Sequence, residues 1–524
     1  MQRRQLVSLI AALGASATLP ATSRAAAPAA GPHAGLEELQ AALRSGRLSA
    51  RALTAQALAR IAQIDRDGPR LNAVIEVNPQ ALAIAQALDR AGVGKPRRGP
   101  LHGIPVLVKD NLASADAMQT SAGSLGLVGV KPPRDAFVVA RLREAGAVIL
   151  GKTNLSEWAN IRSTRSTSGW SSRGGLTRNP YALDRNASGS SSGSAVAVAA
   201  CLCAVAVGTE TDGSIVSPAS VCGIVGLKPS VGLVSRDGIV PISHTQDTAG
   251  PMARSVADAA ALLSAMVGAD PRDQATARAV ATDYTRFLDP QRLRGARLGV
   301  VRNLFGAHDG VNRVIDTALR TLQAQGAVLV DPVELKHTDK YGDAELEVLL
   351  TEFKVGLRGY LAEFAPGAPF GSLKELIAWN LAHRKRVMPW FGQELFERAE
   401  ATRGFDSQAY QDALATCLRY ARTEGIDALL AEHRLDALVA PTGGPAWLTD
   451  LINGDHYGAS FSSPAAVAGY PHLTVPAGFV HGLPVGLSFV GPAFSDGLLI
   501  GLGHSFEQAS RARRPPTLAR TIGI

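Results

Sequence analysis

Residues 188–214 have the sequence SGSSSGSAVAVAACLCAVAVGTETDGS, and the rest of the chain is best understood from this run. It opens with a Ser/Gly loop, Ser188 to Ser194, that passes directly into the small residues Ala195 to Ala200. A flexible linker would not lead straight into residues suited to tight helix packing, so we expect an ordered loop and a helix. The strand Ala204–Val207 then enters a polar turn, Gly208 to Ser214, whose two glycines let several backbone amides face one point. An oxyanion hole needs such a turn.

Helical and strand-like segments alternate on both sides of this run. Apolar residues spaced three and four apart predict helices over Gly35–Asp65, about Pro79–Ala91 and Ala136–Gly146. Apolar runs predict strands at Ile104–Val108, Ala147–Leu150, Leu438–Pro441 and Leu473–Pro476. The alternation indicates the α/β class.

Three further features concern local structure. Ser49 is placed to cap a helix that starts at Ala50. Residues Asn160 to Ser194 lack an apolar period, and a stretch of this length without regular structure is often functional. Residues 270–430 are more helical and more charged, and we expect a lid or a helical subregion there.

Composition excludes several classes of protein. The chain has 524 residues, 46% of them hydrophobic and 19% charged, which excludes global disorder. Its 53 basic and 45 acidic residues give a net charge of +8, an excess too small and dispersed for a nucleic-acid-binding protein. The four cysteines (Cys201, Cys203, Cys222 and Cys417) fit neither a zinc site nor a disulfide framework, so we expect buried thiols.

The first 27 residues have the features of an export signal. Arg3 and Arg4 precede an apolar segment, Leu6–Leu19, that is too short to span a bilayer, and Ser23–Ala27 offers small residues for cleavage. We expect a signal peptide at 1–27, and the paired arginines favour the twin-arginine type. The mature protein would then be periplasmic or secreted, without stable membrane insertion. An uncleaved anchor or a frayed tail is the alternative.

Two segments match the residue patterns of catalytic motifs but lack the surrounding structure that those motifs require. Gly146–Thr153 has P-loop spacing, but its variable positions, Ala147–Leu150, favour a strand over a loop that wraps phosphates. Gly189–Gly193 fits the nucleophile-elbow pattern, but loop residues precede it where a hydrophobic strand is needed. The sequence contains neither Ser-x-x-Lys nor His-Glu-x-x-His, and its eleven histidines show no ligand spacing, so we expect no metal and no cofactor.

A lysine upstream completes the chemical group. Lys109 ends the apolar strand in the segment HGIPVLVKD, residues 102–110, and Ser190 and Ser214 lie 24 residues apart. A Ser-rich glycine loop, a second serine 24 residues on and an upstream lysine together resemble the amidase signature family. Further segments match the family in order along the chain: Leu71–Val74, Gly146–Glu157, Arg178–Pro180, Gly223–Pro229, Asp247–Met252 and Ala468–Pro476.

The resemblance implies a mixed β-sheet core covered by helices on both faces, in one compact domain over residues 28–524. It implies Ser214 as the nucleophile, Ser190 as the bridging serine, preceded by a cis peptide bond in the family, and Lys109 as the base. Lysine is a base only when neutral, so Lys109 needs a dry site that lowers its pKa. The apolar run Ile104–Val108 is a reason to expect one.

The resemblance also implies which groups would face the substrate. The backbone amides of Thr211, Asp212, Gly213 and Ser214 would hold the oxyanion, and Gly189 and Ser191 would line the same site. Because the lysine supplies the base, we expect structural roles for the histidines His102, His244 and His472. The reaction would release ammonia or an amine through an acyl-enzyme.

Within the family, the chain looks most like the bacterial peptide amidases. Ser217 stands three residues after Ser214, where members that take acidic substrates have an arginine, and this argues against a carboxylate-bearing substrate. Two further departures are Ser192 in place of a glycine, and Glu210 and Asp212 in place of aspartate and glycine. We expect C-terminal peptide amides as substrates. Small aliphatic or aryl amides, or oligoamides, remain the alternative; membership of a tRNA-linked amidotransferase complex and a non-catalytic binding role are less favoured.

Overall fold

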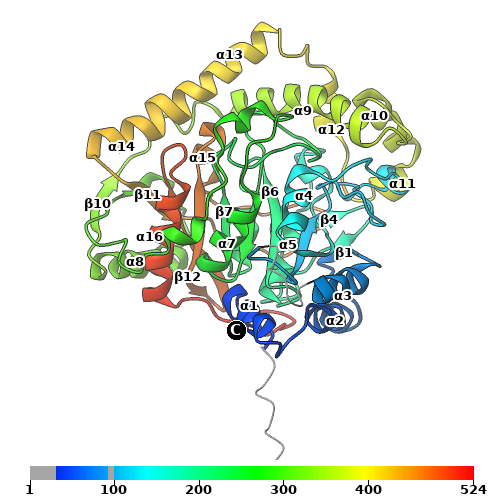
Figure 1. The fold of residues 1–524 in the computed structure, drawn as a ribbon. Helices are drawn as coiled ribbons and strands as arrows, with labels where there is room; N and C mark the ends of the chain where they lie inside the picture. The colour runs from blue at the N-terminus through cyan, green and yellow to red at the C-terminus, as the bar shows by residue number, and fades with distance from the viewer. Residues whose placement is uncertain (1–30, 92–98, 524) are drawn as a thin grey trace, which may run out of the picture.

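The computed structural model describes residues 31–91 and 99–523 (Figure 1). The predicted export signal at 1–27 lies outside the described residues. Eleven strands form one mixed sheet. Their spatial order is β1 (Val74–Val77), β3 (Val148–Thr153), β2 (Pro105–Lys109), β6 (Val205–Glu210), β8 (Thr248–Ala253), β7 (Val225–Lys228), β12 (His472–Val480), β13 (Leu483–Val490), β11 (Ala437–Pro441), β9 (Arg297–Val301) and β10 (Val328–Val333).

Helices cover both faces of this sheet, as predicted. They are α1 (Leu36–Arg44), α2 (Ala50–Arg60), α3 (Ala81–Ala91), α4 (Phe137–Glu144), α5 (Ser192–Ala199), α6 (Val216–Val221), α7 (Val256–Met266), α8 (Asp309–Ala324), α9 (Gly342–Phe364), α10 (Leu373–Ala382), α11 (Arg384–Val387), α12 (Glu394–Glu400), α13 (Gln408–Cys417), α14 (Ala428–His433), α15 (Ser462–Ala468) and α16 (Asp496–Ser510). The pleat of the strands separates the two layers, because successive side chains point to opposite faces. In β2, Val106 and Val108 join the core that contains α7, while Leu107 joins the core that contains α5.

The centre of the sheet sets the polarity of the site. β2 runs parallel to β3 and to β6, so the carboxyl ends of these three strands lie at the same edge. β8 runs antiparallel to β6, and its first residue, Thr248, pairs with Glu210 at that edge. Polar residues that follow or end these strands are therefore brought together.

Local expectations hold at the amino-terminal helices. The periodic segment from Gly35 to Asp65 forms α1 and α2, and Ser49 Oγ accepts a hydrogen bond from the amide of Ala52 at 3.0 Å. The segment with P-loop spacing is strand β3, which is buried throughout, so no phosphate-wrapping loop exists there. The long segment before Ser190 has only the short strands β4 (Trp170–Ser171) and β5 (Gly175–Leu176) between Asn160 and α5, apart from a 3₁₀ turn that ends at Asn160.

The region 270–430 is only partly as predicted. Helices α8 to α14 dominate it, and Figure 1 shows α9, α10, α13 and α14 along one end of the sheet. However, β9 and β10 also come from this region and form the edge of the main sheet beside β11. The region is thus rich in helix and also supplies two strands of the main sheet. β9 is a short apolar run that becomes a strand through its pairing partners, which local periodicity does not reveal.

The segment at residues 514–520, here called the strap, packs against the loop before the Ser/Gly run. The amide of Leu518 donates to Pro180 O at 3.1 Å, and the amide of Leu183 donates to Ala519 O at 2.9 Å. The hydroxyl of Tyr181 donates to Arg514 O. The strap thus fixes a loop that leads directly to Ser188. Among the described helices, none is both long and apolar enough to cross a bilayer.

Candidate active site

Lys109, Ser190 and Ser214 form one chain of hydrogen-bonding groups. Lys109 is the last residue of β2 and is wholly buried. Its Nζ donates to Ser190 Oγ at 2.8 Å, and Ser190 Oγ donates to Ser214 Oγ at 3.0 Å. Ser214 is slightly exposed, whereas Ser190 is not. The order lysine, inner serine, outer serine leads from the core to the surface of the site.

Thr209 fixes the position of the lysine amine. Lys109 Nζ also donates to Thr209 Oγ1 at 2.9 Å and to Thr209 O at 3.2 Å. The side-chain amide of Asn111 donates to the same hydroxyl at 2.9 Å. Sequence reasoning did not single out Thr209, although it lies inside the polar turn quoted above.

The serine loop is held in one geometry by its neighbours. The Gly189–Ser190 peptide bond is cis, as in the family that the sequence resembles. A side chain at Gly189 would place its Cβ 2.2 Å from Ser156 Oγ, so only glycine fits. Gly189 therefore lets the loop pass close to Ser156, which places Ser190 within hydrogen-bonding distance of Ser214.

Ser191 lies elsewhere than the substrate-facing position expected for it. Its hydroxyl donates to Thr209 O at 3.0 Å and accepts from the amide of Thr209 at 3.2 Å. Its own amide donates to Ser214 O at 3.1 Å. Both polar groups are thus used inside the protein, and Ser191 ties the serine loop to the polar turn.

The polar turn presents free backbone donors. Glu210 Oε2 accepts the amides of Ile215 at 2.7 Å and Val216 at 3.0 Å, which fixes the start of α6 beyond the turn. Gly213 has a φ of +74°, a conformation that favours glycine. Across residues 31–91 and 99–523, no group accepts a hydrogen bond from the amides of Thr211, Asp212, Gly213 or Ser214. These four amides are available to a substrate oxygen.

The electrostatics suit a neutral lysine. Burial lowers the pKa of Lys109 to about 7, against the opposing effect of the Asp247 and Glu210 charges. Asp247 accepts from Thr211 Oγ1 at 2.5 Å and from the amides of Ile242 and Ser243, and burial raises its pKa to about 6. A large fraction of Lys109 is therefore an uncharged amine near neutral pH.

A second pair of acids lies beside the turn. Asp212 Oδ2 accepts from Ser463 Oγ at 2.5 Å, and Glu345 of α9 accepts from Gln246 Nε2 at 2.9 Å. Burial raises the pKa of both acids, and the neighbouring Asp212 charge adds to the effect on Glu345, whose pKa rises to about 8. Sequence reasoning missed Glu345, which reaches the site from the helical region more than a hundred residues away.

The histidines lie outside this chain of groups. His472 Nε2 is hydrogen-bonded to Ser488 Oγ at 2.6 Å within the sheet, and His244 Nδ1 lies 3.3 Å from Glu352 Oε1. The backbone carbonyl of His102 accepts from Gln40 Nε2. In the described part of the chain, no group of three His, Cys, Asp or Glu residues is arranged to hold a metal ion. The four cysteines are buried and free.

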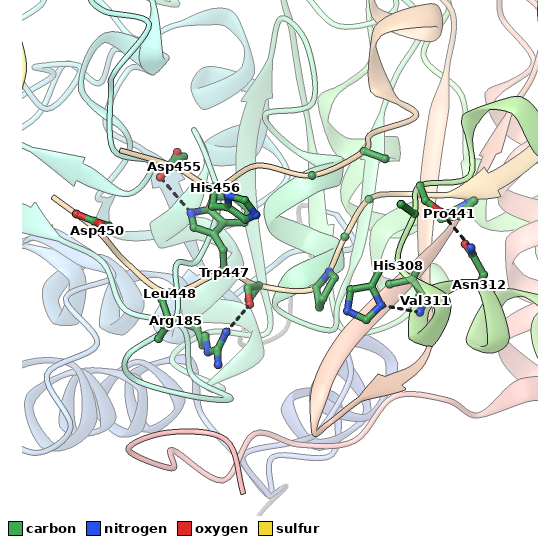
Figure 2. Close-up of a pocket in the computed structure, with 18 of the residues that line it drawn as sticks. Arg185, His308, Val311, Asn312, Pro441, Trp447, Leu448, Asp450, Asp455 and His456 are labelled. Carbon is green, nitrogen blue, oxygen red and sulfur yellow. Dashed lines mark hydrogen bonds between the residues drawn. The ribbon is translucent and has the colours of Figure 1, made fainter. Parts of the chain in front are cut away.

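The structure has a cavity of about 870 Å³ (Figure 2), and none of Lys109, Ser190 and Ser214 lines it. It is bounded by the loop 441–459, by residues 304–312 and by Arg185. A smaller recess shares Trp447 with the cavity and reaches Ser217 and Tyr457. Ser217 Oγ in turn lies 2.8 Å from Ser188 Oγ, two residues before Ser190.

Comparison with known proteins gives consistent matches over most of the chain. The Amidase family model matches residues 52–500. A probable amidase of Arabidopsis thaliana is 41% identical over 494 residues, which are 92% of this chain and 91% of that protein. A glutamyl-tRNA(Gln) amidotransferase subunit of Halorhodospira halophila is 36% identical, covering 90% and 96%. The X-ray structure of native peptide amidase from Stenotrophomonas maltophilia aligns with a TM-score of 0.89 and 54% identity, covering 92% of this chain and 98% of that one.

Proposed function

This chain belongs to the amidase signature family and is an amide hydrolase, and from that premise we propose that it removes ammonia from C-terminally amidated peptides. The single observation that carries the chemistry is the chain from Lys109 Nζ to Ser190 Oγ to Ser214 Oγ. A serine hydroxyl is a weak nucleophile until a base takes its proton. Here the base is reached through a second serine.

The first half-reaction forms an ester on Ser214. Neutral Lys109 takes the proton of Ser190 while Ser190 takes the proton of Ser214, whose Oγ attacks the carboxamide carbon. The amides of residues 211–214 hold the negative oxygen of the tetrahedral intermediate. Ser190 then passes a proton to the departing nitrogen and regains one from Lys109, the C–N bond breaks and ammonia leaves.

The second half-reaction releases the acid. A water molecule loses its proton through the same two groups and attacks the ester carbon. The carbon–oxygen bond to Ser214 breaks, and Ser214 recovers its proton. The products are the free carboxylic acid and the unchanged enzyme.

Two observations support a peptide amide as the substrate. The identity of 54% to the Stenotrophomonas maltophilia peptide amidase exceeds the 36% to the tRNA-linked amidotransferase. Beside the nucleophile, Ser217 offers a neutral hydroxyl, bonded to Ser188, where an arginine would favour an acidic substrate.

The test is ammonia release from a panel of amides by protein lacking residues 1–27, with Ser214→Ala as the control. The panel holds peptide amides, the same peptides as free acids, aliphatic amides and an anilide. We expect ammonia from the peptide amides while internal peptide bonds stay intact. Turnover of small amides or the anilide alone would contradict the peptide substrate and keep the amide chemistry.

We further propose that residues 1–27 direct export, on the strength of the paired arginines and the short apolar segment after them. Cell fractionation of wild type and of a variant with Arg3→Lys and Arg4→Lys tests this. We expect the wild type outside the cytoplasm and the variant retained inside. Equal distribution of the two would contradict the twin-arginine route.

A further inference from the structure

The cavity beside the site is already formed, and apolar side chains make up much of its lining beside the charged groups of Arg185, Asp450 and Asp455. Its walls include Val311 on one side and Trp447 and Leu448 on the other (Figure 2), and Leu304 and Ala446 also line it. Ligand pockets in proteins commonly measure ~300–1,000 Å³. The volume of about 870 Å³ therefore accommodates more than one amino-acid residue.

A thin wall separates this cavity from the nucleophile. Tyr457 packs edge-on against Trp447, with ring centroids 5.5 Å apart and an interplanar angle of 87°. The Tyr457 hydroxyl donates to Ser217 Oγ at 3.3 Å, and the amide of Ser217 donates to Gly213 O at 2.9 Å. The recess along this wall shares Trp447, Gly458 and the segment 443–445 with the cavity. The cavity and the recess thus share part of their lining, and the recess reaches Ser217, three residues after Ser214.

The aromatic wall is anchored to the segment that precedes the Ser/Gly loop. Asp455 accepts the indole N–H of Trp447 at 3.2 Å and the amide of Ser168 at 2.9 Å. The side chain of Asn186 donates to the same carboxylate at 3.3 Å. This carboxylate holds the aromatic wall against the loop that leads to Ser190, so the cavity has a fixed position relative to the nucleophile.

We propose that this cavity binds the peptide residues that precede the amidated residue and that it favours apolar side chains there. The inference rests on the proposed function and names the part of the substrate that this cavity recognises. Burying an apolar side chain of the peptide in this cavity removes apolar surface from water, which favours peptides that carry such side chains. The recess beside Ser217 is narrow, so the carboxamide end lies at Ser214 while the preceding residues occupy the wider space.

Two glycines permit the cavity to be filled without disturbing its walls. A Cβ atom at Gly444 or at Gly458 meets no atom within 4 Å, and neither residue has a positive φ. Gly444→Phe and Gly458→Phe therefore place a ring in open space. Gly359→Phe is the matched control, because Gly359 also meets no atom and lies on α9, away from the cavity lining.

The measured quantity is the ratio of kcat/KM for an apolar tripeptide amide to kcat/KM for a single amino-acid amide. We expect Gly444→Phe and Gly458→Phe to lower this ratio at least ten-fold, mainly through KM, and Gly359→Phe to leave it unchanged. Equal effects on both substrates, or no effect on either, would overturn the assignment.

A binding measurement separates this inference from the proposed reaction. In the Ser214→Ala background, calorimetric titration with the same tripeptide amide reports affinity without turnover. We expect the Gly444→Phe change to raise Kd at least ten-fold in that background. Absence of binding by Ser214→Ala, or binding that Gly444→Phe does not weaken, would reject the subsite, whereas an inactive wild type that still binds would reject only the reaction.

Discussion

Two buried lysines stand side by side in the sheet and meet different surroundings. Lys109 in β2 pairs with Thr153, and its neighbour Val108 pairs with Lys152 in β3. Because side chains alternate along a strand, this one-residue step sends the two lysines to opposite faces. Lys109 reaches Ser190, whereas Lys152 donates to Leu112 O and to Thr120 Oγ1.

Burial acts on both lysines in the same direction. It lowers the pKa of Lys109 to about 7 and that of Lys152 to about 8. A lowered lysine pKa is therefore insufficient to mark a catalytic base. What distinguishes Lys109 is the pair of hydroxyls in line with its amine, and the two sites can be tested against each other.

The largest expected effect follows from replacing each lysine with methionine. A general base contributes about 100–10,000-fold to a rate, so Lys109→Met should lower kcat by that factor in an ammonia-release assay. Lys152→Met should stay within a few-fold of wild type, because its amine touches no group of the site. An equal loss of kcat in both variants, with circular dichroism showing that both are folded, would contradict the distinction between the two lysines.

The next effect concerns the link between base and nucleophile. Ser190→Ala removes the only hydroxyl between Lys109 Nζ and Ser214 Oγ, and we expect kcat to fall about 100-fold or more. Thermal unfolding should change little, since alanine fits the same space. Near-full activity would show that Lys109 reaches Ser214 without a relay.

The pH dependence comes third. Lys109 must be neutral to accept a proton, so kcat/KM should rise with pH through a midpoint near 7 and fall about ten-fold per unit below it. Asp247→Asn removes a negative charge that raises this pKa, so the midpoint should move to lower pH. Lys152→Met should leave the midpoint in place; a matching shift there would indicate that the wrong lysine titrates.

The smallest effect is on stability. Lys152→Met leaves Leu112 O and Thr120 Oγ1 without their buried donor, which should lower the free energy of unfolding by roughly 1–3 kcal/mol. The pKa of Lys152 near 8 in the folded protein lies below the value of ~10.4 in unfolded chains. The stabilisation that neutral Lys152 contributes is therefore complete above pH ~10.4 and is lost as the pH falls through 8. Urea denaturation at pH 6 and pH 10 should thus show the larger loss at pH 10. A loss independent of pH would mean that Lys152 titrates normally.

The sequence predicted the site better than it predicted the surroundings of the site. Lys109, Ser190 and Ser214 follow recognisable local patterns, and the structure brings them within hydrogen-bonding distance. The helices on both faces follow from the family resemblance, because apolar periodicity alone indicates only the α/β class. Residues whose type and spacing form a local pattern can be predicted from the sequence.

The sequence did not predict the roles of residues whose partners are distant along the chain. Ser191 was expected to face the substrate, but Thr209, which it meets only in the folded chain, engages its hydroxyl. Glu345 and Tyr457 approach the turn from α9 and from the loop 441–459, and no periodic pattern marks them. Strand β9 likewise depends on its pairing with β11, which tertiary packing decides.

The strap has a consequence for how the protein is made. Tyr181 and Arg514, which it joins, are 333 positions apart, so the ribosome adds the strap long after the loop that it holds. A chain is synthesised from its amino terminus, and a domain generally folds as a unit. A nascent polypeptide that already contains Lys109, Ser190 and Ser214 still lacks the contact that fixes the approach to Ser188. The catalytic centre is therefore completed only late in translation. A fusion partner attached near residue 520 would disturb the strap, on which the catalytic centre depends.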